Sequence, residues 1–227
     1  MRTLFFSLLF LFFSTGAQAL GLNDLSNKDA VAGLKEALVK GAGNAVGKLG
    51  VADGFLGNDK VKIPLPDSLQ KVDGMLRKFG MSKYADELVV TMNRAAEAAV
   101  PEAKTLLIKA VKEMSVQDAK GILSGGDTAA TEYFRGKTSQ PLAEKFLPIV
   151  QKATTKVKLA EKYNQFAGKA TKFGLVDEKQ ANLESYVTQK TLDGLFVMMA
   201  EEEKGIRADP VGQTSKLLSK VFGAIGK

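Results

Sequence analysis

The chain has 227 residues, no histidine, no cysteine and a formal net charge of +7. The absence of both residue types excludes disulfide frameworks, Ser-His-Asp and Cys-His nucleophiles, the usual zinc sites and His- or Cys-ligated haem, so we expect no cofactor, no metal and no catalytic residue. Acidic and basic residues are interleaved without a run of five like charges, which favours a mixed solvated surface and no nucleic-acid partner.

Residues 1–19 have the pattern of a secretory signal peptide. Arg2 precedes an apolar run at residues 4–13, and a small-x-small triplet ends at Ala19. Because this run is about half as long as the roughly 20 residues of a membrane-spanning helix, a retained anchor is the weaker interpretation. We expect cleavage after Ala19 and a periplasmic protein. The mature chain would carry 31 basic and 25 acidic residues, a net charge of +6, and residues 20–227 suffice for a single domain.

The first predicted helix of the mature chain covers residues 28–49. Its apolar residues fall within about 80° on a wheel of 100° per residue. It also contains four glycines, which are Gly33, Gly41, Gly43 and Gly47. Each glycine weakens a helix by roughly 1 kcal/mol relative to alanine, so the partner helix must either supply packing energy or approach closely enough to require glycine. We expect this helix to be locally soft.

Residues 50–66 interrupt the helical period with glycines and two prolines. Ile63 and Leu65 each precede a proline, which favours extended backbone geometry. We therefore expect a long irregular connection that lies over the core as a strap, with a short edge strand as the alternative. Asp67 and Ser82 are expected to cap the next two helices.

The second of these helices contains the polar residues Asn93, Arg94 and Glu97 among small apolar residues. A wheel places them opposite the apolar stripe, with Arg94 and Glu97 as neighbours and Pro101 on the same side. The first interpretation is therefore a solvent-exposed face, on which water replaces the hydrogen bond that Pro101 removes. The alternative is a functional cluster, because the kink frees a carbonyl beside three polar residues that another helix could cover.

Capping residues predict the later helix starts. These residues are Ser115, Asp127, Ser139 and Asp209 with Pro210. The two glycines before Asp127 could cradle an anion, but Asp127 would itself occupy the positive end of its helix. Arg135 lies two turns further along the same face, where it could pair with an acid of another helix. The helix that Ser139 opens is expected to run to about Lys156.

Residues 192–200 are apolar on all sides of a helix apart from Asp193 and Gly194. This pattern indicates burial on most sides. Met198 and Met199 are expected either to fill the core or to line a ligand pocket.

Three successive glutamates follow this apolar stretch. Consecutive helical residues point 100° apart, so the three carboxylates cannot all reach solvent if the helix stays enclosed. One interpretation is that the helix emerges into water, with Glu203 and Arg207 as an i, i+4 pair. The other is that one of the three glutamates turns inward and meets Arg94 or Arg135.

The C-terminal sequence TSKLLSKVFGAIGK predicts a cationic amphipathic helix. Lys216, Lys220 and Lys227 fall within about 40° of one another, opposite an apolar side that includes Phe222. Such a helix either docks on the core of its own domain or lies in an anionic membrane interface.

Several long phrases of the chain resemble one protein family. They are LSNKDAVAGLKEAL, VKIPLPDSLQKV, MNRAAEAAVPEAK, GILSGGDTAATEYFR and VTQKTLDGLFVMMAEEEKGIRADPVG. This set is similar to exported bacterial helical proteins known as a domain of unknown function, number four-one-nine-seven in that series. The resemblance covers nearly the whole mature chain and implies an exported helical domain. It implies no reaction, substrate or site residue.

The sequence therefore predicts an all-α, single-domain bundle of about eight helices with one long irregular connection. The favoured function is non-catalytic binding of an apolar or lipid-like ligand in a cavity between the helices. The alternative is an interaction or structural protein of the cell envelope that docks on a membrane surface through its C-terminal helix. An enzyme that uses Glu97, Asp127 or Glu202 is the third hypothesis. The candidate ligand-binding residues are Asn93, Arg94, Glu97, Asp127, Arg135, Glu202, Met198 and Met199, and the candidate membrane-contact residues are Lys216, Lys220, Phe222 and Lys227.

Overall fold

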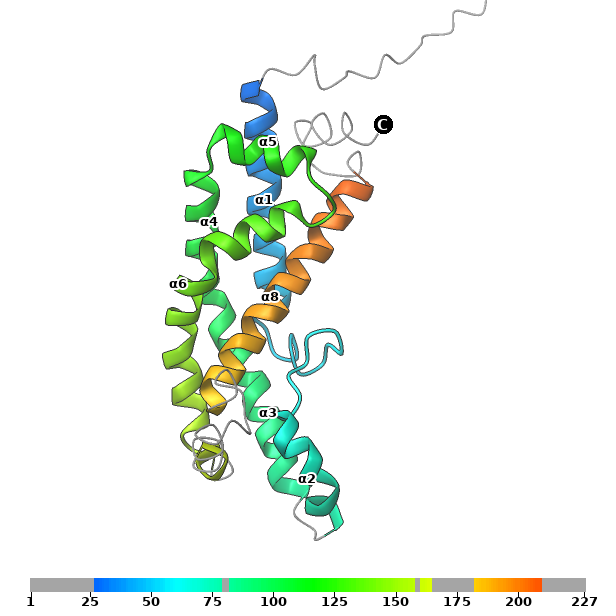
Figure 1. Cartoon of the computed structure of the whole chain (residues 1–227), viewed down its shortest axis with the longest axis vertical. Coiled ribbons are helices and arrows are strands. Elements are labelled where there is room, and N and C mark those ends of the chain that lie inside the picture. Colours follow the sequence, from blue (N-terminus) through cyan, green and yellow to red (C-terminus); the bar gives the residue numbers. More distant parts are fainter. Residues whose placement is uncertain (1–26, 79–81, 158–159, 165–181, 210–227) are drawn as a thin grey trace, which may run out of the picture.

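The computed structural model describes residues 27–78, 82–157, 160–164 and 182–209 (Figure 1). Seven α-helices, one 3₁₀ turn and no strand occur in this part of the chain, which confirms the all-α class and comes close to the expected eight helices. None of the helices described combines the length and the hydropathy that crossing a bilayer requires. The expected signal peptide and C-terminal helix lie outside the described residues.

The bundle is built around one long helix near the C-terminus. The helices are α1 (Asn27–Leu49), α2 (Asp67–Lys78), α3 (Ser82–Ala99), α4 (Ala103–Glu113), α5 (Val116–Ser124), α6 (Ala129–Thr154) and α8 (Leu183–Ala208). α8 packs most extensively against α6 and α1, and it runs diagonally across the bundle in Figure 1. α2 packs on α3, and this pair forms the lower end of the molecule in the same view. The core therefore lies along α8.

Three of the four glycines of α1 are not explained by a close approach of another helix. A Cβ on Gly41 would meet Ile206 Cδ1 at 3.5 Å and Glu202 Cβ at 3.7 Å, which are ordinary contact distances, and a Cβ on Gly43 or Gly47 would meet nothing within 4 Å. Of the two expectations for α1, the structure favours the first, because apolar packing against α8 and α4 compensates its low helix propensity.

A 3₁₀ turn separates α3 from α4 where a bend at Pro101 was expected. The turn covers Val100–Glu102 and has Pro101 in its first positions. Pro101 is exposed, as the helical wheel predicts. Tightening of the backbone to i, i+3 hydrogen bonds thus accommodates the missing N–H group of the proline.

The expected helix start at Ser139 is wrong, because α6 is continuous through Pro141 and Pro148. Ser139 Oγ donates a hydrogen bond to the carbonyl of Arg135 at 2.6 Å, one turn earlier. A serine shortly before a proline resembles a helix start, but here its hydroxyl bonds within the helix. α6 bends in its middle in Figure 1, as a helix does where a proline interrupts its hydrogen bonds.

Residues 50–66 form the irregular strap that their composition predicts. No strand occurs in this segment. Five apolar side chains of the strap are buried, namely Phe55, Val61, Ile63, Leu65 and Pro66. The strap thus covers part of the core, and its main-chain polar groups need partners from the helices beneath it.

Candidate functional site

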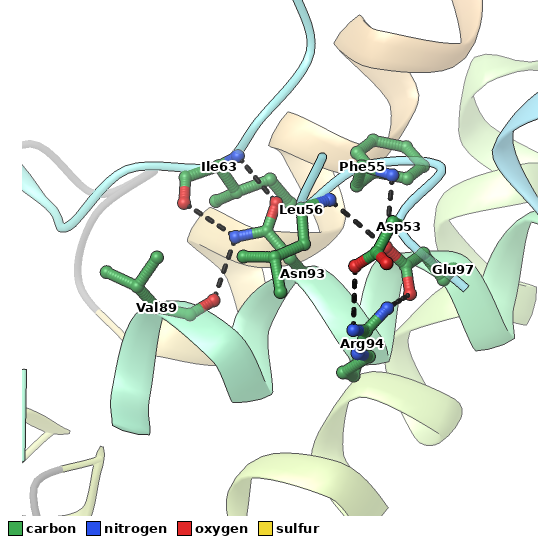
Figure 2. Close-up of polar contacts among 8 residues, drawn as sticks. All are labelled: Asp53, Phe55, Leu56, Ile63, Val89, Asn93, Arg94 and Glu97. Atoms are coloured by element: carbon green, nitrogen blue, oxygen red, sulfur yellow. Dashed lines mark hydrogen bonds and ion pairs between the residues drawn. The ribbon is translucent and has the colours of Figure 1, made fainter. Parts of the chain in front are cut away.

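The polar residues of α3 lie under the strap (Figure 2). Asn93 is fully buried and binds both main-chain groups of Ile63. Its Oδ1 accepts a hydrogen bond from Ile63 N at 2.8 Å, and its Nδ2 donates to Ile63 O at 2.9 Å and to Val89 O at 2.8 Å. The amide of Asn93 therefore makes the two hydrogen bonds to Ile63 that a neighbouring β-strand would otherwise make.

Glu97 binds the strap at a second point, one helical turn further along α3. Its Oε1 accepts hydrogen bonds from Phe55 N and Leu56 N, both at 3.0 Å. Its Oε2 accepts from Arg94 Nη1 at 2.6 Å, and Arg94 Nη2 donates to Asp53 Oδ1 at 2.8 Å. The hydrogen bond to Glu97, and then that to Asp53, raise the pKa of the Arg94 guanidinium. Figure 2 shows three of these links joining α3 to the strap and the fourth joining Arg94 to Glu97 within α3.

The expectation of a solvent-exposed face is wrong for two of the three residues. Asn93 and Glu97 are buried, and only Arg94 is exposed. The neighbouring positions of Arg94 and Glu97 are confirmed. The helical wheel fails because the covering element is an irregular segment. The turns of this segment satisfy only some of its main-chain groups, so the N–H groups of Phe55, Leu56 and Ile63 take their acceptors from the polar face of α3.

Asp53 belongs to this cluster but was not among the predicted residues. Its φ of 66° lies in the left-handed region, which Asp tolerates better than most residues. The Asp53–Gly54 dipeptide is a turn signal that could have indicated this conformation. The ion pair with Arg94 depends on the fold and has no signature in the sequence.

The strap also fits against α8 at Gly194. A Cβ on this residue would lie 2.6 Å from Phe55 Cε1 and 3.2 Å from Val61 Cβ. Glycine is therefore required here by the close approach of the Phe55 ring. Together with Asn93 and Glu97, this contact fixes the strap against two helices.

A second buried carboxylate, Glu203 of α8, lies at the start of α6. It accepts hydrogen bonds from Ala130 N at 3.0 Å and from Thr131 N and Thr131 Oγ1 at 2.9 Å. Arg207 Nη2 donates to Glu203 Oε1 at 2.8 Å and to Ile122 O at 3.0 Å. Glu203 thus occupies the N-terminus of α6, where a negative charge is favourable.

This arrangement corrects two predictions. Asp127 is exposed and does not cap α6, whose N-cap is Thr128, because Glu203 already accepts the N–H groups of the first turn. The glutamate that turns inward is Glu203, and its partner is Arg207 on the same helix. The pairing of these two residues is confirmed, but the helix does not emerge into water at Glu203.

An apolar cavity of about 30 Å³ lies beside Glu203, between α1, α5, α6 and α8. Its walls include Leu34, Leu38 and Gly41 of α1, Phe134 of α6, and Met199 and Ile206 of α8. Met199 is therefore both core residue and cavity wall. Met198 is buried elsewhere, and its Sδ lies 3.7 Å from Asn58 Nδ2 in the strap. Neither Leu34, Leu38 nor Ile206 was predicted as a site residue, because apolar residues on a helix stripe carry no functional signature.

Glu202 belongs to a polar groove on the other side of the α1–α8 contact. It accepts hydrogen bonds from Asn44 Nδ2 at 3.0 Å and from Lys48 Nζ at 2.5 Å. The groove has a volume of about 490 Å³ and is also lined by Lys40, Glu201 and Ile206, among others. The predicted residue is thus in a recess, but it meets α1 and neither Arg94 nor Arg135.

Within the part of the chain that the structure describes, Arg135 does not pair with an acid of another helix. Its guanidinium lies 4.6 Å from the ring centroid of Phe196 on α8, and its Nε lies 3.6 Å from Glu132 Oε1 on its own helix. The cross-helix contact is therefore a cation–π interaction.

The predicted site residues thus fall into separate places. Asn93, Arg94 and Glu97 meet at the strap, while Glu202, Met199 and Arg135 lie at different contacts of α8. Glu97 and Glu202 have different partners, and Asp127 is exposed at the start of α6, so the three do not form the convergent carboxylates that the enzyme hypothesis needs. Among the described residues, no group of three or more acidic side chains is placed to hold a metal ion. Lys216, Lys220, Phe222 and Lys227 lie outside the described residues.

Comparison with known proteins identifies one family. A family model described as "Protein of unknown function (DUF4197)" matches residues 24–223. This match confirms the resemblance that the phrases of the sequence predict. No curated protein and no solved structure matches the chain.

Proposed function

The chain belongs to the DUF4197 family of proteins of unknown function, and from this premise we propose that it is an exported, non-catalytic binding protein for an apolar, lipid-like ligand. The proposal includes cleavage after Ala19 and a periplasmic location. The observation that carries it is the apolar cavity between α1, α5, α6 and α8. Catalysis fits the structure less well, because the polar side chains under the strap, which are Asp53, Asn93, Arg94 and Glu97, bind one another and the main chain.

The cavity supports a binding role through the chemistry of its walls. Aliphatic and aromatic side chains from four helices surround it, and its charged lining residues, Glu203 and Arg207, bind each other and nearby polar groups. A ligand in this space would therefore meet apolar surface. Burial of such a ligand is favourable by about 25 cal/mol per Å² of apolar area removed from water.

The cavity must widen to accept a ligand, because typical ligand sites measure about 300–1,000 Å³. α1 is a wall that is better suited to move than α8. Gly41, Gly43 and Gly47 lower its intrinsic helix stability by roughly 1 kcal/mol each relative to alanine. Displacement of this helix by an aliphatic chain would then cost less than displacement of α8, which has fewer glycines in a longer helix.

Native mass spectrometry of the mature protein, purified from the periplasm without detergent, tests the proposal. We expect a polypeptide that begins at Leu20 and carries a stoichiometric added mass, which solvent extraction removes and chemical analysis identifies as an apolar molecule. A protein with no added mass, and with no affinity for fluorescent fatty acids after extraction, would refute the binding function.

A cavity-filling variant locates the site. Ala42→Val adds two methyl groups at the cavity wall, so it should weaken fatty-acid binding by about tenfold, the equivalent of roughly 1.4 kcal/mol. Ala32→Val makes the same chemical change at an exposed position of α1 and should leave binding unchanged. Equal affinities for the two variants would place the ligand elsewhere.

The second candidate function is contact with the cell envelope through residues 213–227. The sorting of Lys216, Lys220 and Lys227 opposite apolar residues supports this proposal. Flotation of the mature protein with anionic liposomes should decrease when residues 213–227 are removed. Equal flotation of the two forms would contradict it.

A further inference from the structure

We infer that the ligand is an amphiphile with a zwitterionic head, whose chain enters past Ile206 into the apolar cavity and whose head lies in the groove between α1 and α8. The inference rests on the proposed binding function and specifies its ligand class. Three observations support it. The groove adjoins the cavity, the charged residues of the cavity already have hydrogen-bond partners, and the two walls of the groove carry opposite charges.

The apolar cavity and the polar groove meet at a single side chain. Ile206 lines both of them. Its Cδ1 lies 3.5 Å from the position that a Cβ on Gly41 would occupy. Ile206 thus lies between the two spaces where it faces Gly41, and the inferred entry path requires a rotamer change of Ile206. The groove of about 490 Å³ has the size of a ligand site, which the cavity alone lacks.

The end of the ligand that enters the cavity must be apolar. Glu203 accepts hydrogen bonds from Ala130, Thr131 and Arg207, and Arg207 also donates to Ile122 O. A charged or hydrogen-bonding ligand group at this point would have to break one of these buried contacts, which costs several kcal/mol. A hydrocarbon chain leaves all of them intact.

The groove walls carry opposite charges. α1 contributes Lys40, Asn44 and Lys48, whereas α8 contributes Glu201 and Glu202. Lys48 and Asn44 both donate to Glu202, whose side chain is 14% exposed. Each wall therefore offers one half of an ion pair to a molecule that enters between them.

This pairing favours a zwitterion over a simple anion. An anion that took the donors Lys48 and Asn44 would lie beside the carboxylate of Glu202, which would lose both hydrogen bonds, and two like charges at short range repel each other. A head with a phosphate and an ammonium group replaces both partners. Its phosphate accepts from Lys48 and Asn44, its ammonium group donates to Glu202, and the net charge of the site is unchanged.

The test compares probes that share one alkyl chain and differ in the head. They are a lysophospholipid with a phosphoethanolamine head, an alkyl phosphate and an alkyl alcohol, measured by displacement of a fluorescent fatty acid from the extracted mature protein. We expect the zwitterionic probe to bind about tenfold more tightly than the other two, which corresponds to roughly 1.4 kcal/mol.

Pairs of matched variants test where the head and the alkyl chain of the ligand bind. Lys48→Gln should abolish the preference for the zwitterionic head and leave binding of the alcohol unchanged, whereas Lys204→Gln, on the exposed surface of α8, should change neither. Gly41→Val places a branched side chain against Ile206 and should weaken all three probes. Gly43→Val makes the same change where a Cβ meets nothing within 4 Å and should leave them unchanged.

The outcomes separate the two proposals. If the three probes bind equally, if the alkyl phosphate binds best, or if Lys48→Gln keeps the preference for the zwitterion, the inferred head is wrong while the apolar binding function stands. If Gly41→Val and Gly43→Val behave alike, the entry path past Ile206 is wrong. If no alkyl probe displaces the fatty acid or binds directly, the binding function itself fails.

Discussion

Glu97 and Glu203 are two buried carboxylates that make similar contacts at two places in the core. Each accepts hydrogen bonds from two successive main-chain N–H groups and from an arginine of its own helix. Glu97 fixes the irregular strap on α3, as Figure 2 shows, whereas Glu203 caps α6 from α8. The same arrangement therefore anchors a loop in one place and starts a helix in the other.

The two sites differ in how their arginines meet water. The side chain of Arg94 is 42% exposed and also binds Asp53 at the surface, whereas that of Arg207 is 13% exposed and also binds a main-chain carbonyl. Loss of the carboxylate should thus be costlier at Glu203, because water can solvate Arg94 more easily than Arg207. A buried acid beside an arginine, which resembles a catalytic pair in the sequence, is a structural anchor in both cases.

The largest expected effect is at Glu203. Glu203→Ala should lower the free energy of unfolding by about 3–5 kcal/mol, because it removes the acceptor for the first turn of α6 and the charge that neutralises Arg207. Urea unfolding followed by circular dichroism measures the change. Glu36→Ala, on the exposed side of α1, should change stability by less than about 0.5 kcal/mol. A loss below about 1 kcal/mol for Glu203→Ala would contradict the comparison.

Glu97→Ala should cost less, about 2–3 kcal/mol. Two strap N–H groups lose their acceptor, at about 1–3 kcal/mol for each that stays buried, while Arg94 keeps Asp53 and solvent contact. Hydrogen exchange locates the damage, since the amides of Phe55 and Leu56 should exchange faster while those of Ala130 and Thr131 do not. Uniform acceleration across all four amides would show that the strap is not a separate anchored unit.

The fit of the strap on α8 provides a third test. Gly194→Ala should destabilise the fold by about 1–2 kcal/mol, because the new methyl group overlaps Phe55, although alanine favours the helix. Gly205→Ala on the same helix meets no atom within 4 Å and should stabilise it by up to about 1 kcal/mol. Thermal unfolding of the two variants should therefore shift in opposite directions. Shifts of the same sign would argue against the close contact.

The smallest effect concerns pH and the far end of the strap. Tyr186 OH donates to Pro64 O at 3.1 Å, and burial raises the pKa of Tyr186 above its usual value of 10.0. A raised folded-state pKa contributes stability that is complete below pH 10 and lost as the pH rises through the folded value. Tyr186→Phe should cost about 0.5–1.5 kcal/mol near neutral pH. Above pH 10 the difference between the two proteins should shrink, and a constant difference would refute the assignment.

Local signals in the sequence were sufficient to predict a structural feature where its contacts join residues that are close in the chain. Ser115 caps α5 as expected, and Asp118 completes a capping box in which its carboxylate accepts from Ser115. These hydrogen bonds lower the pKa of Asp118. The strap was also predictable, because prolines and glycines exclude a regular helix whatever surrounds them.

Contacts between distant residues account for the errors. The first turn of α6 is capped by Glu203, which lies 73 residues from Ala130, so the local candidate Asp127 was not used. Asn93 and Glu97 were placed in water because a helical wheel shows only one helix and not the segment that covers it. The cavity walls could not be chosen from the sequence either, since every apolar stripe of the bundle looks alike.

The sequence by itself determined the helical class, most helix starts, the strap and the family, because these depend on backbone preference, apolar period and long shared phrases. The tertiary structure decided which of the polar residues are buried and what they bind. The physical reason is that desolvation of a carboxylate or an amide is tolerated only when specific partners replace water. Those partners are main-chain groups of remote segments, and only the packed fold brings them within hydrogen-bond distance.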